Sequence, residues 1–100
     1  MTVSAVRHVI IHGRVQGVGY RAWVEHMAQR RRLRGWVRNR HDGTVEAVFT
    51  GPAAAVTAMI EACRRGPPGA RVESVDVRET ADSELSTIRT GEEFSVLPTV

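Results

Sequence analysis

The order in which strand-like and helix-like segments follow one another constrains the fold of this chain more than any other feature. Arg7–Val15 alternates imperfectly between apolar and polar residues, which is typical of a strand with a largely buried environment. A helix is predicted from Tyr20 to about Leu33, because apolar residues there recur every three or four positions. These apolar residues are Tyr20, Trp23, Val24, Met27 and Ala28.

The next part of the chain predicts a hairpin and a second helix. Trp36–Arg40 and Thr44–Thr50 are strand-like, and the Asp-Gly pair at 42–43 favours a tight turn between them. A second helix is expected to begin at Pro52, which suits the first helical position because no N–H is needed there. The apolar face of this helix comprises Val56, Met59, Ile60 and Cys63.

The last part of the chain predicts two further strands. The stretch RRGPPGA, Arg64–Ala70, ends the second helix because glycine and proline do not continue it. Three valines within residues 72–77 indicate a strand, and their irregular spacing indicates a bulge. Glu79–Glu93 is polar and is predicted to be a loop, followed by a short strand over residues 94–96.

The complete order is therefore strand, helix, strand, strand, helix, strand, strand. Two strand–helix–strand units joined by a hairpin make a ferredoxin-like split βαβ arrangement, here with one additional strand. We expect an α+β sandwich in which two helices cover one face of a five-stranded, mostly antiparallel sheet. A chain of 100 residues that is 42% hydrophobic suits one core, so residues 1–100 are predicted to form a single domain.

Charge and composition limit where such a domain can act. All 14 basic residues are arginine, and the formal net charge of +3 favours anionic partners, although the absence of lysine could equally reflect genomic base composition. No stretch resembles a signal peptide, and none reaches the length needed to cross a membrane. The single cysteine, Cys63, excludes an internal disulfide. We expect a soluble, cytoplasmic protein that does not bind membranes, with a monomer as its simplest state.

The stretch GRVQGVGYR, residues 13–21, has the clearest chemical meaning. Its glycines lie between a strand and the start of a helix, where free main-chain N–H groups and the positive end of the helix dipole create an anion site. The Arg21 guanidinium can also bind two phosphate oxygens in a bidentate way. An ordinary tight turn followed by a surface arginine explains the spacing equally well. The stretch matches neither the dinucleotide-binding fingerprint nor the P-loop.

Three stretches resemble one known family. GRVQGVGYR followed by GWVRNRHDGTVEAVFTG, residues 35–51, resembles the two signature stretches of the acylphosphatase family, in the family's order and at a similar separation. GPPGARVESVDV, residues 66–77, is similar to the region after the family's second helix, so the likeness covers essentially the whole chain. The resemblance implies the ferredoxin-like fold predicted above. It also implies hydrolysis of the carboxyl-phosphate bond of acyl phosphates to a carboxylate and inorganic phosphate, without a metal or an organic cofactor.

The resemblance implies a set of site residues as well. The family's phosphate-binding loop corresponds to Gln16, Gly17, Val18, Gly19 and Tyr20. Its phosphate-binding catalytic arginine corresponds to Arg21, and its water-orienting catalytic asparagine corresponds to Asn39. Tyr20 stands where phenylalanine is common in the family, which is a mild change. Leu97-Pro98 stands where a basic residue is often found, and this departure could alter the acyl side of the substrate.

The chemistry of acyl phosphates agrees with these residue types. Phosphoryl transfer mainly requires positioning and stabilisation of charge on the phosphoryl oxygens, which Arg21 and the loop N–H groups can provide. The carboxylate leaving group is a weak base and needs no general acid. The Asn39 amide has both a donor and an acceptor and can hold a water in line with the phosphorus. Without the family resemblance, an asparagine that ends a strand before a turn is more simply explained by a structural role.

No metal site is predicted, and the expected partner is a small-molecule acyl phosphate. The histidines show no metal-ligand spacing and are expected at surface or half-buried positions; they are His8, His12, His26 and His41. Cys63 is expected to pack on the apolar face of the second helix. Inorganic phosphate or sulfate should compete with the substrate, since either anion can occupy the same loop.

Two other functions fit part of the pattern. The basic charge and the fold suit an RNA-recognition module, but such modules stack bases on aromatic residues of two central strands. Val9–His12 offers no aromatic residue, and Phe49 is expected to face the core, so no nucleic acid partner is predicted. The other alternative is a regulatory anion-binding domain with a vestigial site, against which the presence of both Arg21 and Asn39 counts.

Overall fold

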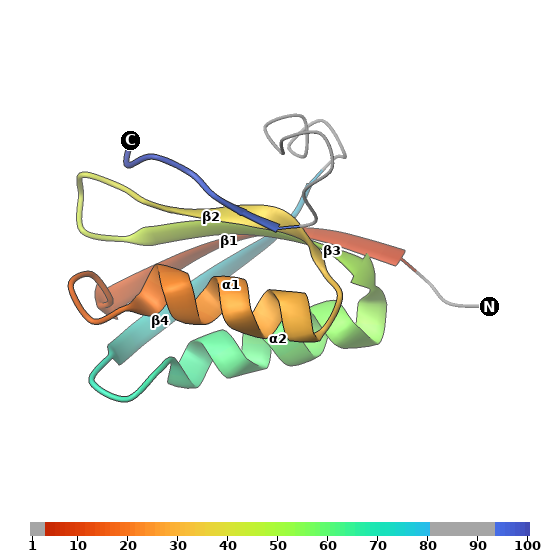
Figure 1. Cartoon of the computed structure of the whole chain (residues 1–100), viewed down its shortest axis with the longest axis horizontal. Helices are drawn as coiled ribbons and strands as arrows, with labels where there is room; N and C mark the ends of the chain where they lie inside the picture. The colour runs from red at the N-terminus through yellow and green to blue at the C-terminus, as the bar shows by residue number, and fades with distance from the viewer. Residues whose placement is uncertain (1–3, 81–93) are drawn as a thin grey trace.

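The computed structural model describes residues 4–80 and 94–100 and contains seven elements in this part of the chain (Figure 1). They are β1 (Ser4–Arg14), α1 (Tyr20–Arg30), β2 (Arg34–Asn39), β3 (Val45–Pro52), α2 (Ala53–Arg65), β4 (Arg71–Glu79) and β5 (Phe94–Val96). The predicted order of strands and helices is confirmed. The loop predicted over Glu79–Glu93 lies mostly outside the described residues.

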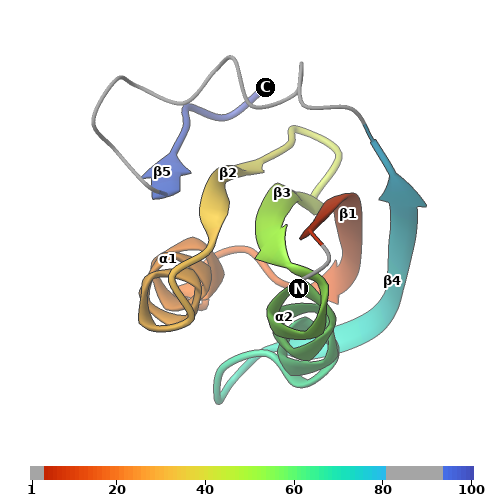
Figure 2. The same ribbon diagram turned by 90° about the vertical axis from the view of Figure 1, so that its right-hand side faces the viewer.

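The strands form one sheet in the order β4-β1-β3-β2-β5. Neighbouring strands are antiparallel except β2 and β5, which are parallel. Figure 2, which looks along the helices, shows α1 and α2 side by side on one face of the curved sheet. The predicted ferredoxin-like sandwich is confirmed. None of the helices in the described residues is both long and apolar enough to cross a membrane.

The core lies between the two helices and the sheet. Phe49 on β3 is fully buried there, and its ring stacks on Phe94 of β5 with 5.8 Å between the ring centroids. The expectation that Phe49 faces the core is confirmed, so this aromatic ring is not displayed for base stacking. Cys63 on α2 is also buried, and burial raises the pKa of its thiol to about 12. Cys63 is therefore a packing residue, as predicted.

Helix α1 ends at Arg30, earlier than the predicted end near Leu33. Arg32 has a φ of 57°, and its N–H donates to the carbonyl of Gln29 at 3.0 Å. The N–H of Leu33 donates to the carbonyl of Ala28 at 2.9 Å. This pair of bonds is a Schellman motif, which closes a helix and returns the next side chain to the core. The apolar pattern extended to Leu33 because that buried residue packs from the closing turn, not from the helix.

Two details of the second half differ from or refine the sequence predictions. Pro52 is the N-cap of α2 and the last residue of β3, not the first helical residue, because its ψ of 135° is extended. The bulge predicted in the fourth strand is confirmed. The register between β1 and β4 shifts after His12, which pairs with Ser74, whereas Gly13 pairs with Val72.

The sheet face away from the helices carries a buried polar cluster. Nε2 of His8 lies 2.7 Å from Oε2 of Glu46, and Nε of Arg38 donates to Oε1 of Glu46 at 2.7 Å. The Arg38 guanidinium also lies over the ring of Trp36, 4.5 Å from its centroid. His8 and Glu46 are both buried, so the expectation of a surface or half-buried position is wrong for His8. Its partner lies on a neighbouring strand, which the local sequence does not reveal.

The other three histidines lie at half-buried or exposed positions, as predicted. Within residues 4–80 and 94–100 there is no group of three or more histidine, cysteine or acidic residues that could hold a metal ion.

The buried cluster predicts a pH-dependent contribution of Glu46 to stability. Burial alone would raise the pKa of Glu46, but hydrogen bonds from His8 and Arg38 outweigh it and hold this pKa below its ordinary value of 4.5. A carboxyl whose pKa is lower in the folded state stabilises the fold above its unfolded pKa, and this contribution is lost as the pH falls through the folded pKa. We expect Glu46→Gln to lower the free energy of unfolding by about 2 kcal/mol at pH 7.

Urea unfolding of the wild type and Glu46→Gln at a series of pH values checks this expectation. The difference between the two proteins should shrink as the pH falls below 4.5. Asp76→Asn is a matched control, because Asp76 forms an exposed pair with His12 at 2.9 Å. That substitution should change stability by less than about 0.5 kcal/mol. A Glu46→Gln difference that is the same at all pH values would contradict the account.

Candidate active site

The loop between β1 and α1 is shaped by two glycines in the left-handed region. Gly17 has a φ of 76° and Gly19 a φ of 79°, whereas Val18 between them does not have a positive φ. Alternation of this kind turns successive N–H groups toward a common hollow, which suits an anion. A Cβ at either glycine would meet no atom within 4 Å, so the backbone conformation and not a lack of space requires glycine here.

The main-chain donors of this loop have no partner in the part of the chain that the structure describes. The N–H groups of residues 17–22 donate no hydrogen bond to another described residue, and the first intrahelical bond runs from the N–H of Trp23 to the carbonyl of Gly19 at 3.0 Å. No side chain caps the helix at Gly19. A helix start with uncapped N–H groups carries a partial positive charge. The loop therefore offers a ready site for an anion.

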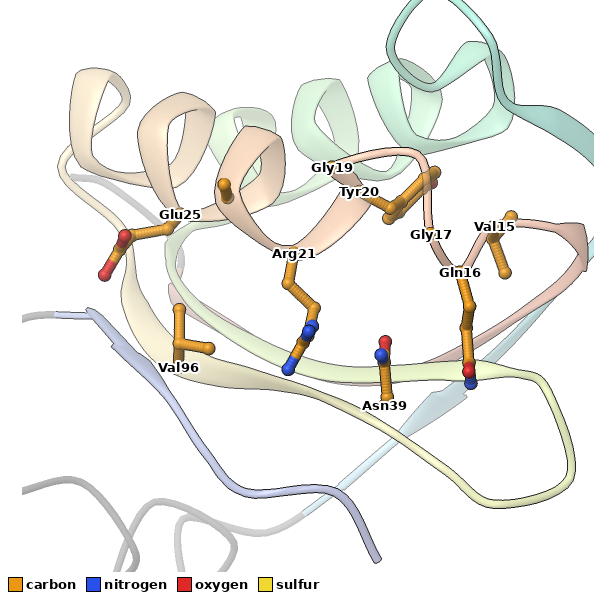
Figure 3. Close-up of a pocket in the computed structure, with 10 residues that line it drawn as sticks. Val15, Gln16, Gly17, Gly19, Tyr20, Arg21, Glu25, Asn39 and Val96 are labelled. Atoms are coloured by element: carbon orange, nitrogen blue, oxygen red, sulfur yellow. The ribbon is translucent and has the colours of Figure 1, made fainter.

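Arg21 and Asn39 face each other across a cavity of about 480 Å³ at this loop. Figure 3 shows the Arg21 side chain extending from α1 and the Asn39 side chain from the end of β2 toward the same space. The Arg21 guanidinium forms no ion pair or hydrogen bond with another described residue. The structure therefore brings together these two residues and four of the predicted loop residues, which also line the cavity: Gln16, Gly17, Gly19 and Tyr20.

The Asn39 backbone is hydrogen-bonded in the usual way, but its side-chain oxygen lacks a partner among the described residues. Its Oδ1 is buried and has no hydrogen-bond partner in the described part of the chain. Its carbonyl, in contrast, accepts a hydrogen bond from the N–H of Val100 at 3.1 Å, and Asn39 pairs with Val45 in the sheet. The backbone is thus held on both sides, while the side-chain acceptor is left for a ligand or a water. A buried acceptor without a partner destabilises the fold, so this arrangement is not expected of an asparagine with a purely structural role.

Gln16 has a different place from the other loop residues. Its side-chain Nε2 donates to the carbonyl of Arg40 at 2.7 Å and to the carbonyl of Thr44 at 2.9 Å. These carbonyls belong to the turn that follows Asn39, so the Gln16 side chain ties the loop to the β2–β3 hairpin. Both N–H groups of this amide are used within the protein, so the Gln16 side chain has no donor left for an anion.

Gln16→Leu should therefore loosen the loop relative to Asn39. The substitution removes two hydrogen bonds and leaves the Arg40 carbonyl without this donor, and small misplacements at such sites are costly. We expect kcat/KM for an acyl phosphate to fall by about tenfold or more. Steady-state kinetics measures the change, and Gln29→Leu on the exposed side of α1 is the control. Equal kinetics for Gln16→Leu and the wild type would show that the hydrogen bonds from Gln16 to the hairpin are unimportant for activity.

Two predicted loop residues direct their side chains away from the cavity. The hydroxyl of Tyr20 donates to the carbonyl of Cys63 at 2.6 Å, which satisfies a carbonyl at the end of α2. Burial raises the pKa of this phenol well above its ordinary value, so it remains protonated. Val18 is the one predicted residue that does not line the cavity, and its side chain packs against the core. Tyr20 and Val18 can serve an anion only through their main-chain N–H groups.

Four further residues line the cavity and were not predicted from the sequence: Val15, Ala22, Glu25 and Val96. Glu25 could have been found, because it lies four positions after Arg21 and so on the same side of α1. Val96 comes from β5, and no local pattern connects it with the loop.

Comparisons with known proteins show which family this sequence and fold resemble. A family model described as Acylphosphatase matches residues 7–95. An acylphosphatase from Bradyrhizobium diazoefficiens is 56% identical over 96 residues, which cover 96% of this chain and 97% of that protein.

Solved structures give the same result. The crystal structure of an acylphosphatase from Bacillus subtilis is 36% identical, with a TM-score of 0.80, over 95% of this chain and 99% of that one. An acylphosphatase structure from Coxiella burnetii is 32% identical, with a TM-score of 0.81, over 94% of this chain and 93% of that one. With its sequence, its fold and the family model in agreement over most of its length, the chain belongs to the acylphosphatase family.

Proposed function

We propose that this protein hydrolyses the carboxyl-phosphate bond of small acyl phosphates, with the loop and Arg21 binding the phosphate and Asn39 positioning the attacking water. Membership of the acylphosphatase family supports the reaction. The free N–H groups of residues 17–22 and the unpaired Arg21 guanidinium support the phosphate site. Amides and a guanidinium are the donors that bind phosphoryl oxygens best, and the guanidinium can do so in a bidentate way.

In the proposed reaction, water attacks phosphorus and the bond between phosphorus and the bridging oxygen breaks. The electron pair of that bond leaves with the carboxylate, and the water oxygen remains in the inorganic phosphate. Negative charge on the equatorial phosphoryl oxygens is stabilised by the loop N–H groups and by Arg21. The proton released by the water passes to phosphate or solvent. No general acid is needed, because a carboxylate is a stable leaving group.

Asn39 acts on the water by position. A water that donates to the buried Oδ1 can direct a lone pair toward phosphorus. Holding a nucleophile in the correct geometry lowers the barrier by several kcal/mol. The observation that carries the proposal is this juxtaposition of a buried, unpaired acceptor with uncapped helix N–H groups in one cavity.

Release of inorganic phosphate from benzoyl phosphate tests the proposal. The wild-type protein should hydrolyse this acyl phosphate without added metal, and a chelator should not lower the rate. Inorganic phosphate and sulfate should inhibit competitively, since each would occupy the same loop. Phosphate binding without turnover would overturn the proposal in favour of a regulatory anion-binding domain. Salt-dependent binding of single-stranded RNA that excess phosphate does not affect would instead favour the RNA-binding alternative.

A further inference from the structure

We propose that Glu25 selects the acyl group, so that the site favours acyl phosphates whose acyl group carries a positive charge over those whose acyl group carries a second negative charge. The inference rests on the proposed function, because it assumes that the phosphate lies at the loop. It goes further by assigning a specificity-determining residue and the chemical class of the preferred substrate.

The placement of Glu25 follows from helix geometry. Residues four apart on a helix are neighbours on one face, so Glu25 lies one turn along α1 from Arg21. Both residues line the cavity. Val96 of β5 lines the same end, and Figure 3 shows Glu25 and Val96 on the side of Arg21 opposite to Asn39. The cavity thus has a polar phosphate end near the loop and a second end bounded by a carboxylate and an apolar side chain.

The geometry of the reaction places the acyl group at this second end. In an in-line displacement, the attacking water and the leaving carboxylate lie on opposite sides of phosphorus. With the phosphate against Arg21 and the water at Asn39, the leaving carboxylate points away from Asn39, toward Val96 and Glu25. The substituent attached to that carboxylate then approaches Glu25, while Val96, which is 40% exposed, offers apolar contact.

The charge of Glu25 is available to such a substituent. Glu25 is half-buried and forms no ion pair or hydrogen bond with another described residue, including its helix neighbour Arg21. Glu46 and Glu61, by contrast, are paired with arginines. An unpaired carboxylate in a partly desolvated cavity repels a second anion and attracts an ammonium group. Among the described residues that line the cavity, the other charged side chain is Arg21, which binds the phosphate in the proposed complex.

Three benzoyl phosphates of similar size test this inference: unsubstituted benzoyl phosphate, its para-carboxy derivative and its para-aminomethyl derivative. The quantity measured is the ratio of kcat/KM for the aminomethyl derivative to kcat/KM for the carboxy derivative within each variant. We expect Glu25→Gln to lower this ratio by about tenfold. The aminomethyl substrate loses its attraction to the Glu25 carboxylate, whereas the carboxy substrate is no longer repelled by it. In the wild type, the ratio should also fall as salt is added, since the interaction is screened.

Controls separate this effect from others. Glu61→Gln removes the same charge from an exposed position on α2 and should leave the ratio unchanged. Glu25→Ala should lower the ratio as Glu25→Gln does, which guards against a fault in folding of one variant. An unchanged ratio in both Glu25 variants, with unsubstituted benzoyl phosphate still hydrolysed, would overturn the inference alone. Failure of the wild type to hydrolyse any of the three benzoyl phosphates would overturn the proposed function and the inference together.

Discussion

Arg21→Ala should lower kcat/KM for benzoyl phosphate on the order of 10³-fold, since one preorganised donor aimed at developing charge is worth this much. The guanidinium has no other described partner, so its removal should leave the fold intact. Steady-state phosphate release measures the loss. The inhibition constant for inorganic phosphate should rise as well, because Arg21 is proposed to bind the ground-state phosphate in addition to the transition state.

Two further variants define what Arg21 contributes. Arg21→Lys keeps the charge but cannot bind two oxygens with a planar fork, so we expect only partial recovery. Arg30→Ala removes an exposed arginine from the other end of α1 and should leave kcat/KM within about twofold of the wild type. If Arg21→Ala and Arg30→Ala behaved alike, Arg21 would have no role beyond the general charge of the protein.

Asn39→Ala is expected to lower kcat by about 10²-fold while the inhibition constant for inorganic phosphate changes little. The reason is that Asn39 is proposed to hold the water and not the phosphate. The free energy of unfolding should stay the same or rise, because the variant removes a buried acceptor that has no described partner. A structural asparagine would give the opposite result, with a less stable protein and kinetics that recover once the folded fraction is taken into account.

Asn39→Asp separates position from charge. The aspartate has a similar shape but carries a negative charge next to the proposed phosphate site, so it should weaken phosphate binding as well as lower kcat. Full activity in Asn39→Asp would indicate that the residue acts as a base, which the proposed mechanism does not require.

The sequence predicted the fold because its apolar residues follow the periods of the elements they form. The stripe that begins at Tyr20 and the alternation in β3 both come from side chains that pack in one core. The errors arose where a buried residue lies outside a regular element. Leu33 continues the helical spacing but belongs to a left-handed closing turn, and Pro52 fits both an N-cap and a first helical position.

The candidate site could be predicted only in part for a related reason. The loop and Arg21 are contiguous in sequence, and Asn39 was found through resemblance to a family. The cross-strand partner of His8 and the approach of Val96 to the cavity depend on which strands are neighbours in the sheet. Likewise, the two carbonyls that bind the Gln16 side chain become its neighbours only when the hairpin closes against the loop. Contacts of this kind are set by topology and not by local pattern.

A crystal structure of the protein with inorganic phosphate would show directly where the phosphate and the water lie. We expect a phosphate within hydrogen-bond distance of the N–H groups of residues 17–21 and of the Arg21 guanidinium, with an ordered water bound to Asn39 Oδ1 on one side of phosphorus. A phosphate bound at another place, or a loop that stays empty while Arg21 and Asn39 turn to other partners, would contradict this expectation.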